Sequence, residues 1–295
     1  MSLLGFPGTT GSSYMDYLVA DSCLIPSHLR QHYTEKILYL PASCYVNDHC
    51  QLFSNLIKEV PKNAILPRPE VASIAKPLPF SNTLTKHTRQ DFGLPPNKIL
   101  LCNFNQLYKL DPYTFDVWCR VLYQCPETIL VLLRFPRCAE SMLRKRAAKN
   151  GVAGDRVLFV DVKPQAEHIQ RTSLCDLFLD TVVINAHHTG MDALWAGVPV
   201  ISIQGEKLSA RVGSSLLTAM GLEELVCSDL EEYEAKAVHF ASNIYVLREQ
   251  QNKVRLRRFT TSLFDTLNWT RNFEKGLEVI VEDFNRGEQK RDVFL

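Results

Sequence analysis

The sequence has almost no net charge, because its 33 lysines and arginines are matched by 32 aspartates and glutamates over 295 residues. Proteins that bind nucleic acid or anionic membranes through their overall field carry a clear excess of positive charge, so we expect neither partner. No run approaches the roughly 18 apolar residues of a membrane span. The N-terminal residues lack the basic start and long apolar core of a secretory signal, so we expect a cytoplasmic or nuclear protein.

Several motifs that bind cofactors or metals are missing. There is no G-x-G-x-x-G after a strand and no G-x-x-x-x-G-K-[S/T], which argues against dinucleotide oxidoreductases and P-loop enzymes. The nine cysteines form no C-x-x-C pair, and the spacing of Cys44, His49 and Cys50 fits no common zinc site. There is also no D-x-D, the acidic pair that holds a metal in many sugar transferases. We therefore predict buried thiols, no metal site and no cofactor.

From residue 98 onward, short apolar runs alternate with segments of helical spacing. The runs of strand type are KILLCNF, TILVLLRF, RVLFVDV, CDLFLD and VPVISI. Such alternation predicts parallel βαβ units with right-handed crossovers, and hence an α/β fold with a doubly wound sheet. The last 65 or so residues show helical patterns only.

The first 95 residues differ from this rhythm. MDYLVAD and KILYLPASCYV are predicted strands, with a helix in PSHLRQHYTEK between them, and a proline-rich linker follows. Two or three strands cannot complete a doubly wound sheet, so we expect here the end of an N-terminal lobe that begins before this chain. The expected organisation is 1–65 for this incomplete lobe, 66–95 for the linker, 96–228 for a complete C-terminal Rossmann-like lobe, and 229–295 for helices that pack on the lobes.

Polar side chains follow three of the predicted strands. Because the carboxyl ends of parallel strands meet at one edge of a sheet, these groups should converge there. The first group is Asn103, Asn105, Gln106 and Lys109, the second is Lys163, Gln165, His168 and Arg171, and the third is His187, His188, Thr189 and Asp192.

The third group suggests a site for an anion. Thr189 is placed to cap a helix, and Gly190 would let a ligand approach the backbone. The N-terminus of a helix favours an anion by about 0.3–2 kcal/mol. An imidazole can donate to a phosphate oxygen, and Asp192 suits the vicinal hydroxyls of a ribose, so together they point to a nucleoside diphosphate. A capped helix with two incidental histidines explains this stretch equally well, and Lys109, taken singly, is typical of a solvated surface group.

These segments closely resemble a known family. LCNFNQLYKLDPYTFDVW, LLRFP, TGMDALWAGVPV and GEKLSARVGSSLLTAMGLEELV are similar to the catalytic region of the O-linked N-acetylglucosamine transferases, as is GFPGTTGSSYMDYLVAD upstream. The resemblance implies a GT-B fold, in which two Rossmann-like lobes hold the donor between them. It also implies metal-independent, inverting transfer of GlcNAc from UDP-GlcNAc to Ser and Thr hydroxyls of nuclear and cytoplasmic proteins.

The resemblance also implies roles for individual residues. Lys109 would stabilise the departing UDP, assisted by His187, and Asp192 would contact the ribose. Pro7 and Thr9 would face the sugar. The remaining expected contacts with the nucleotide sugar are Gln106 near the uracil nucleotide and diphosphate, His168 and Arg171 beside the uracil, and His188 and Thr189 at the diphosphate turn. The resemblance identifies no general base in this chain.

The sequence departs from the family at several positions. Gln165 replaces a lysine near the diphosphate, His188 replaces a threonine, and Ile184 replaces a cysteine of close relatives. Family members carry tetratricopeptide repeats and most of the N-terminal lobe before the point that corresponds to residue 1 here. Two alternatives therefore stay open. The first is a non-catalytic UDP-sugar-binding fragment or pseudoenzyme, and the second is a UDP-sugar epimerase-like GT-B protein.

Overall fold

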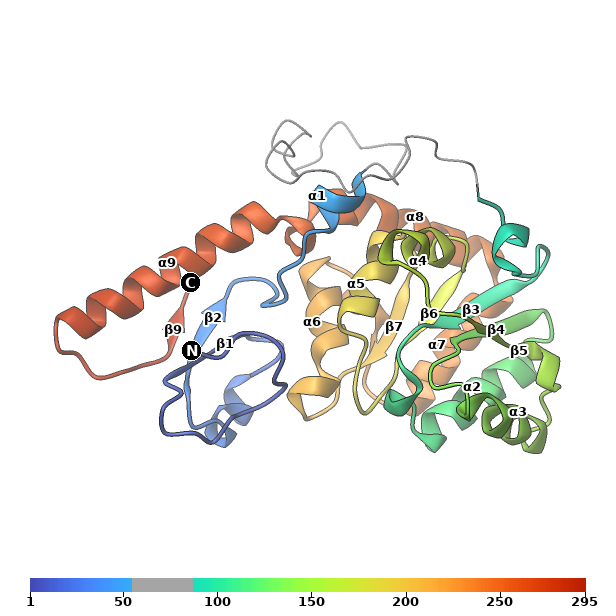
Figure 1. Ribbon diagram of the computed structural model, residues 1–295, viewed down its shortest axis with the longest axis horizontal. Helices are drawn as coiled ribbons and strands as arrows, with labels where there is room; N and C mark the ends of the chain where they lie inside the picture. Colours follow the sequence, from blue (N-terminus) through green and yellow to red (C-terminus); the bar gives the residue numbers. More distant parts are fainter. Residues whose placement is uncertain (55–86) are drawn as a thin grey trace.

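Two parallel β-sheets organise the chain, as the ribbon of the computed structural model shows (Figure 1). The structure describes residues 1–54 and 87–295. The expected linker at 66–95 falls outside the described residues up to 86. Within the described ranges, no helix is long and apolar enough to cross a membrane.

The larger sheet confirms the predicted doubly wound α/β arrangement. Its strand order is β5-β4-β3-β6-β7-β8 with all pairs parallel, so the order of the chain reverses between β3 and β6. The strands are buried and apolar because helices cover both faces. The strands are β3 (Ile99–Asn103), β4 (Thr128–Leu133), β5 (Val157–Val160), β6 (Leu177–Leu179), β7 (Val200–Ile203) and β8 (Val226–Cys227). The two-residue strand β8 extends the sheet beyond the five strands predicted.

The helices form two groups around this sheet. Helix α2 packs against α7 on one face, whereas α5 packs against α4 and α6 on the other. Asp111 caps α2 by accepting hydrogen bonds from the N–H groups of Tyr113 and Thr114, which explains why this helix begins at Pro112. The helices are α2 (Pro112–Gln124), α3 (Ala139–Lys149), α4 (Gln165–Thr172), α5 (His188–Trp195), α6 (Val212–Ala219) and α7 (Leu230–Ser242).

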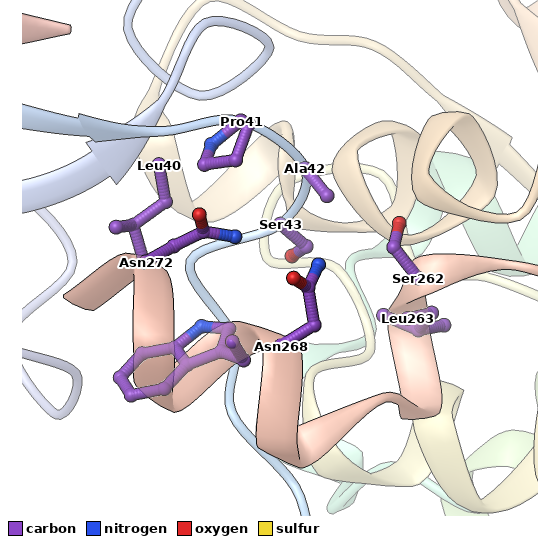
Figure 2. Close-up of a pocket in the computed structure, with 9 residues that line it drawn as sticks. Leu40, Pro41, Ala42, Ser43, Ser262, Leu263, Asn268 and Asn272 are labelled. Carbon is purple, nitrogen blue, oxygen red and sulfur yellow. The ribbon is translucent and has the colours of Figure 1, made fainter. Parts of the chain in front are cut away.

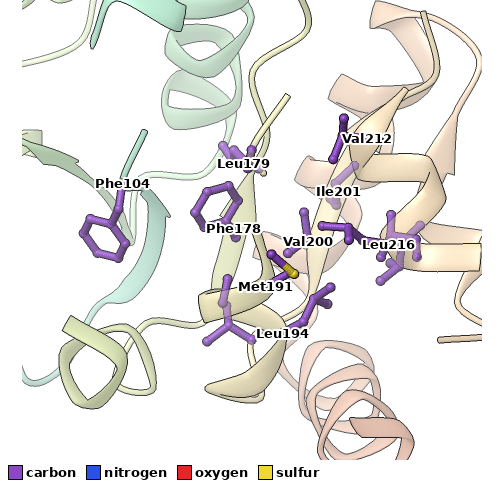
Figure 3. Close-up of a cluster of buried hydrophobic side chains, with 14 of the residues drawn as sticks. Phe104, Phe178, Leu179, Met191, Leu194, Val200, Ile201, Val212 and Leu216 are labelled. Atoms are coloured by element: carbon purple, nitrogen blue, oxygen red, sulfur yellow. The ribbon is translucent and has the colours of Figure 1, made fainter. Parts of the chain in front are cut away.

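One part of the core lies between β6, β7 and the helices α5 and α6 (Figure 3). The side chains of Phe178, Met191 and Leu194 are fully buried there, and Val212 and Leu216 of α6 close the cluster from the other side. These buried apolar residues recur at helical spacing in α5 and α6, so burial on one face fixes the orientation of both helices against the sheet. The start of α5 is thereby held beside the carboxyl end of β6.

The smaller sheet is built from both ends of the chain. Its order is β1 (Tyr17–Asp21), β2 (Lys36–Leu40) and β9 (Val293–Phe294), all parallel. A short helix, α1 (His49–Phe53), follows β2. Helices α8 (Ile244–Thr260) and α9 (Thr266–Asn285) lead back from the larger sheet, and α9 packs against β2.

Three expectations for the N-terminal and C-terminal segments are wrong. Residues 27–32 form only the 3₁₀ helix η1 (Ser27–His32), because none of its residues is buried to stabilise a longer helix. The C-terminal segment is not purely helical, because β9 pairs with the open edge of β2 and Phe294 stacks on Tyr39 with ring centroids 4.4 Å apart. The long helical run after residue 229 is also interrupted at Asn243, whose side chain caps α8.

A buried polar network joins the two sheets. Asp21, at the end of β1, accepts hydrogen bonds from the N–H groups of Leu24 and Cys44 at 2.9 and 3.0 Å. It also accepts one from the hydroxyl of Ser215 on α6 at 2.8 Å, and Ser215 contacts the hydroxyl of Ser43 at 2.9 Å. The end of β1 and the loop after β2 are therefore tied directly to a helix of the larger sheet.

We expect Gly276→Val to loosen the packing of α9 on the smaller sheet. A Cβ at Gly276 would lie 2.5 Å from Cδ1 of the fully buried Leu38, so any side chain overpacks the contact with β2. Such overpacking typically costs about 1–3 kcal/mol, which urea denaturation should detect as a lower free energy of unfolding. Glu278→Val introduces the same side chain on an exposed part of α9 and serves as the control. Equal stability of the two variants would contradict this account.

Candidate functional site

The candidate site lies where the strand order reverses, at the carboxyl ends of β3 and β6. The amide of Asn103 donates to the carbonyl of Leu179 at 2.7 Å, and the amide of Asn105 donates to the hydroxyl of Thr181 at 2.8 Å. Both asparagines are buried. They hold the two diverging loops together, so these predicted candidates support the site rather than face a ligand.

Lys109 is held beside the loop that follows β6. It ends the 3₁₀ helix η5 (Leu107–Lys109), and its Nζ donates to the backbone carbonyl of Asn185 at 2.9 Å. Burial lowers the pKa of Lys109, whereas the nearby Asp180 carboxylate opposes that effect. An ammonium group has three N–H donors, so two remain for a ligand. Gln106, just before η5, is exposed.

Asp180 is a buried carboxyl group that sequence analysis did not single out. It accepts hydrogen bonds from the hydroxyl of Ser202 at 2.7 Å and from the N–H groups of Thr181 and Ala186 at 2.8 and 2.6 Å. Burial raises its pKa to about 7, although these donors and Lys109 act in the opposite direction. The hydrogen bonds to Thr181 and Ala186 close the loop whose carbonyl receives Lys109.

The start of α5 differs from the prediction in two ways. His187 rather than Thr189 is the residue before the helix, and the hydroxyl of Thr189 donates to the amide oxygen of Asn105. Gly190 lies in tight packing, because a Cβ there would lie 3.3 Å from both Cβ of Ala186 and Cδ1 of Leu216. The first N–H groups of a helix have no partner within it, so α5 still offers donors to an anion.

His187 is largely buried at this turn. The hydroxyl of Tyr45 lies 3.4 Å from its Nδ1, and its Nε2 has no hydrogen-bond partner among the described residues. Burial, with a smaller contribution from the Lys109 cation, lowers its pKa to about 4, so the ring is neutral at pH 7. The adjacent His188 is exposed. The unpartnered Nε2 is therefore the polar atom here that a ligand would satisfy.

His168 and Arg171 on α4 have unequal positions. Arg171 is 2% exposed and donates to the carbonyl of Asp161 at 2.7 Å and to Nδ1 of His168 at 3.2 Å. Because a guanidinium can only donate, Nδ1 is an acceptor and the neutral His168 ring carries its proton on Nε2. The ring also packs edge-on against Phe104, with centroids 5.1 Å apart. Arg171 thus orients His168.

Two residues donate to the carboxylate of Asp192. Nε2 of His49 lies 2.8 Å from Oδ1 and Nε2 of Gln165 lies 3.0 Å from the same oxygen, whereas Nε2 of His168 is 3.7 Å from Oδ2. Burial raises the pKa of Asp192, but the hydrogen bonds from His49 and Gln165 outweigh it, so the net pKa is lowered. Gln165 therefore faces Asp192. Lys163 instead pairs with Glu167 at 3.2 Å.

The contact of His49 with Asp192 was not predicted from the sequence, in which this histidine was weighed only as part of a zinc pattern. The two residues lie 143 positions apart in the chain. The only local signal is the spacing of His49 and Phe53, which places both rings on one side of α1.

The N-terminal loop is held by a different carboxylate. Thr9 donates to Oε2 of Glu35 at 2.7 Å, and the N–H of Thr10 donates to Oε1 at 2.6 Å. Burial raises the pKa of Glu35, but these donors lower it overall to about 2. Pro7 is exposed. Within the described residues no hydrogen bond joins Pro7 or Thr9 to the α5 turn, so their expected contact with the sugar stays a prediction.

No group of three or more His, Cys, Asp or Glu side chains in residues 1–54 and 87–295 is arranged to hold a metal ion. Figure 2 shows a cavity elsewhere, where the chain leaving β2 meets the 3₁₀ helix η9 (Ser262–Phe264) and α9. Ser43, Asn268 and Asn272 line it, and its volume of about 20 Å³ fits one water molecule. It is too small for a nucleotide, so the open turn at α5 is the stronger candidate.

Comparisons with known proteins agree on one family. The model of glycosyl transferase family 41 matches residues 1–75 and 72–273. The chain is 41% identical over 276 residues to a probable UDP-N-acetylglucosamine–peptide N-acetylglucosaminyltransferase, SEC, of Arabidopsis thaliana, covering 93% of this chain and 26% of that protein. It is 30% identical over 355 residues to the UDP-N-acetylglucosamine–peptide N-acetylglucosaminyltransferase of Caenorhabditis elegans, covering 92% of this chain and 31% of that protein.

A solved structure is similar over nearly the whole chain. The O-GlcNAc transferase of Thermobaculum terrenum, as its K341M mutant, superposes with a TM-score of 0.74 at 25% sequence identity. The superposition covers 95% of this chain and 48% of that one. The likeness therefore includes both the larger sheet and the smaller sheet.

We expect the stability of the protein to fall as the pH drops from 6.5 to 4, in part because of His187. Its folded-state pKa of about 4 lies below the ordinary value of 6.5, so in this range the unfolded chain binds a proton that the folded chain does not. His187→Gln should reduce the slope by at most about 1.4 kcal/mol per pH unit. Urea denaturation at several pH values measures this. His188→Gln is the control for loss of an imidazole, and an unchanged slope in His187→Gln would refute the assignment.

Proposed function

Because the chain belongs to glycosyl transferase family 41, we propose that it forms the donor-binding part of a transferase that moves GlcNAc from UDP-GlcNAc to Ser and Thr hydroxyls of proteins. The family membership and the superposition also confirm the predicted GT-B fold. The chain spans 26% and 31% of the plant and nematode relatives. The transfer reaction of those complete proteins, and their acceptors, are therefore part of this proposal.

The observation that carries the proposal is the meeting of Lys109, His187 and the start of α5 at one edge of the sheet. Lys109 is bound through one N–H to Asn185, which precedes His187 by two residues. A diphosphate placed there would receive the two remaining N–H groups of Lys109, the free N–H groups of α5 and a hydrogen bond from His187. These are donors of the kind that stabilise negative charge on a leaving group.

The reaction would be a single displacement. The acceptor hydroxyl oxygen forms a bond to the anomeric carbon of GlcNAc while the bond from that carbon to the diphosphate oxygen breaks. The electron pair of the broken bond leaves with UDP, and the hydroxyl proton is released. Charge then develops on the diphosphate beside Lys109, whose cation and N–H groups are already in place, so little reorganisation is needed.

The nucleoside would extend from the diphosphate towards α4. Oδ2 of Asp192 would accept from a ribose hydroxyl, and the Nε2–H of His168, fixed by Arg171, would face the base together with the exposed Gln106. The alternative of a non-catalytic UDP-sugar-binding protein is motivated by Gln165, because its amide faces Asp192 and adds no positive charge for a diphosphate. The two functions share the binding site and differ in turnover.

Calorimetric titration tests the binding site directly. We expect UDP to bind more tightly than uridine, because only UDP can use Lys109 and the N–H groups of α5, and more tightly than GDP, because the relatives are named for a uridine nucleotide donor. GDP and uridine are the matched controls for base and diphosphate. Absence of UDP binding, or equal binding of UDP and uridine, would contradict a diphosphate site at α5.

Lys109→Met tests the role in transfer, measured as GlcNAc incorporation into an acceptor protein by the complete enzyme. The loss of a preorganised donor to the developing charge should lower kcat by about 10²–10³, while the side chain keeps a similar length. Lys145→Met on α3 removes an exposed lysine and is the control. Near-normal turnover of Lys109→Met would exclude Lys109 from leaving-group stabilisation.

A further inference from the structure

The two carboxylate oxygens of Asp192 have different surroundings. Oδ1 accepts hydrogen bonds from both His49 and Gln165. Oδ2 receives none from the described residues, since Nε2 of His168 is 3.7 Å away, beyond hydrogen-bond distance. The side chain of Asp192 is 7% exposed. With Oδ1 covered by two donors, Oδ2 is the oxygen left for a ligand.

His49 is fixed on every side of its ring. Phe53 and Phe264 approach it edge-on with centroids 5.8 and 5.6 Å away, and Trp195 of α5 lies at 6.1 Å. Its Nδ1 is 3.3 Å from the amide oxygen of Asn47, whose own Nδ2 donates to the carbonyl of Leu263 at 2.7 Å. The ring therefore cannot turn away from Asp192 without breaking contacts in three segments.

Gln165 supplies the second donor from a different element. It is the first residue of α4 and is largely exposed, so the packing of the chain does not require its side chain. Its amide nevertheless points to Oδ1 of Asp192 rather than to solvent. Two donors on one oxygen, from the segment after β2 and from α4, hold the carboxylate in one orientation.

We propose that His49 and Gln165 are positioning residues that occupy Oδ1 of Asp192 and thereby present Oδ2 to a ribose hydroxyl, so that the site selects nucleotides that carry ribose hydroxyls over 2′,3′-dideoxynucleotides. This inference rests on the proposed function, because it assumes a nucleotide at the α5 turn. It adds to the sequence-based expectation of a contact between Asp192 and the ribose, because it assigns that contact to Oδ2 and names the residues that orient it.

The physical basis is the strength of a hydrogen bond to a charged, oriented acceptor. A hydrogen bond from a hydroxyl to a buried carboxylate contributes more binding free energy than one to a neutral acceptor. This contribution depends on the carboxylate being held in place. Without His49 or Gln165 the carboxylate can rotate, and the ribose would lose this preference. Contacts of the base and diphosphate would be unaffected.

The test compares UDP with 2′,3′-dideoxyuridine diphosphate by calorimetric titration of the whole chain. We expect the wild-type protein to bind UDP about ten- to a hundredfold more tightly. His49→Phe keeps an aromatic ring among Phe53, Phe264 and Trp195 but removes both ring nitrogens, and it should bring the ratio close to one. Gln165→Ala should lower the ratio several-fold. Gln170→Ala on the same helix is the control and should leave the ratio unchanged.

The possible results separate this inference from the proposed function. An unchanged ratio in both variants, or equal weakening of both nucleotides, would overturn the positioning role while leaving UDP binding intact. A wild-type protein that does not distinguish the two nucleotides would also overturn it. If the wild-type protein binds neither nucleotide, the proposed function fails and the inference fails with it. If His49→Phe does not fold, the ratio measured for Gln165→Ala decides, because Gln165 is exposed and its loss cannot act through the core.

Discussion

The reversal of strand order between β3 and β6 is the constraint on which the candidate site depends. The connection after β3 leads to one face of the sheet and the connection after β6 leads to the other, so an opening forms between them at the carboxyl edge. Without side chains that bridge it, such an opening would expose backbone groups and let the two loops move. The amides of Asn103 and Asn105 bridge it, and Lys109 crosses it to the carbonyl of Asn185. Every proposed contact with the diphosphate is built on these bridges.

The charged groups at this edge suit the proposed diphosphate site. Lys109 is partly desolvated, and the buried Asp180 nearby offsets that cost. His187 stays neutral and leaves one nitrogen without a partner. Between α4 and α5 the central group is an anion instead. The carboxylate of Asp192 accepts hydrogen bonds from two donors and lies beside the neutral imidazole of His168. The anionic part of one ligand would thus meet Lys109 and His187, and its hydroxyl-bearing part would meet Asp192.

Much of the larger sheet could be predicted from the sequence, because its strands are continuous apolar runs and its helices have one apolar face. The convergence of Lys109, His187 and Asp192 followed from topology alone. The finer roles could not be predicted. That Thr189 contacts Asn105, that Gly190 serves packing, and that His49 reaches Asp192 all depend on pairs of residues far apart in the chain. The strand β9 escaped prediction because two residues show no periodicity, and their pairing depends on an edge that β2 leaves open.

The pairing of β2 with β9 also bears on the order in which the protein folds. Leu38 of β2 pairs with Val293 of β9 in one sheet. Beside this pair, the N–H of Ile37 donates to the carboxylate of Asp292, which lies 255 positions further along the chain. Closing so long a loop costs entropy before any contact repays it, whereas the contacts of the larger sheet join strands much nearer in sequence. During synthesis β1 and β2 leave the ribosome long before β9 does, and the edge of β2 stays unpaired until β9 appears. The larger sheet should then be the unit that forms first, and the smaller sheet the last part of the fold to be completed.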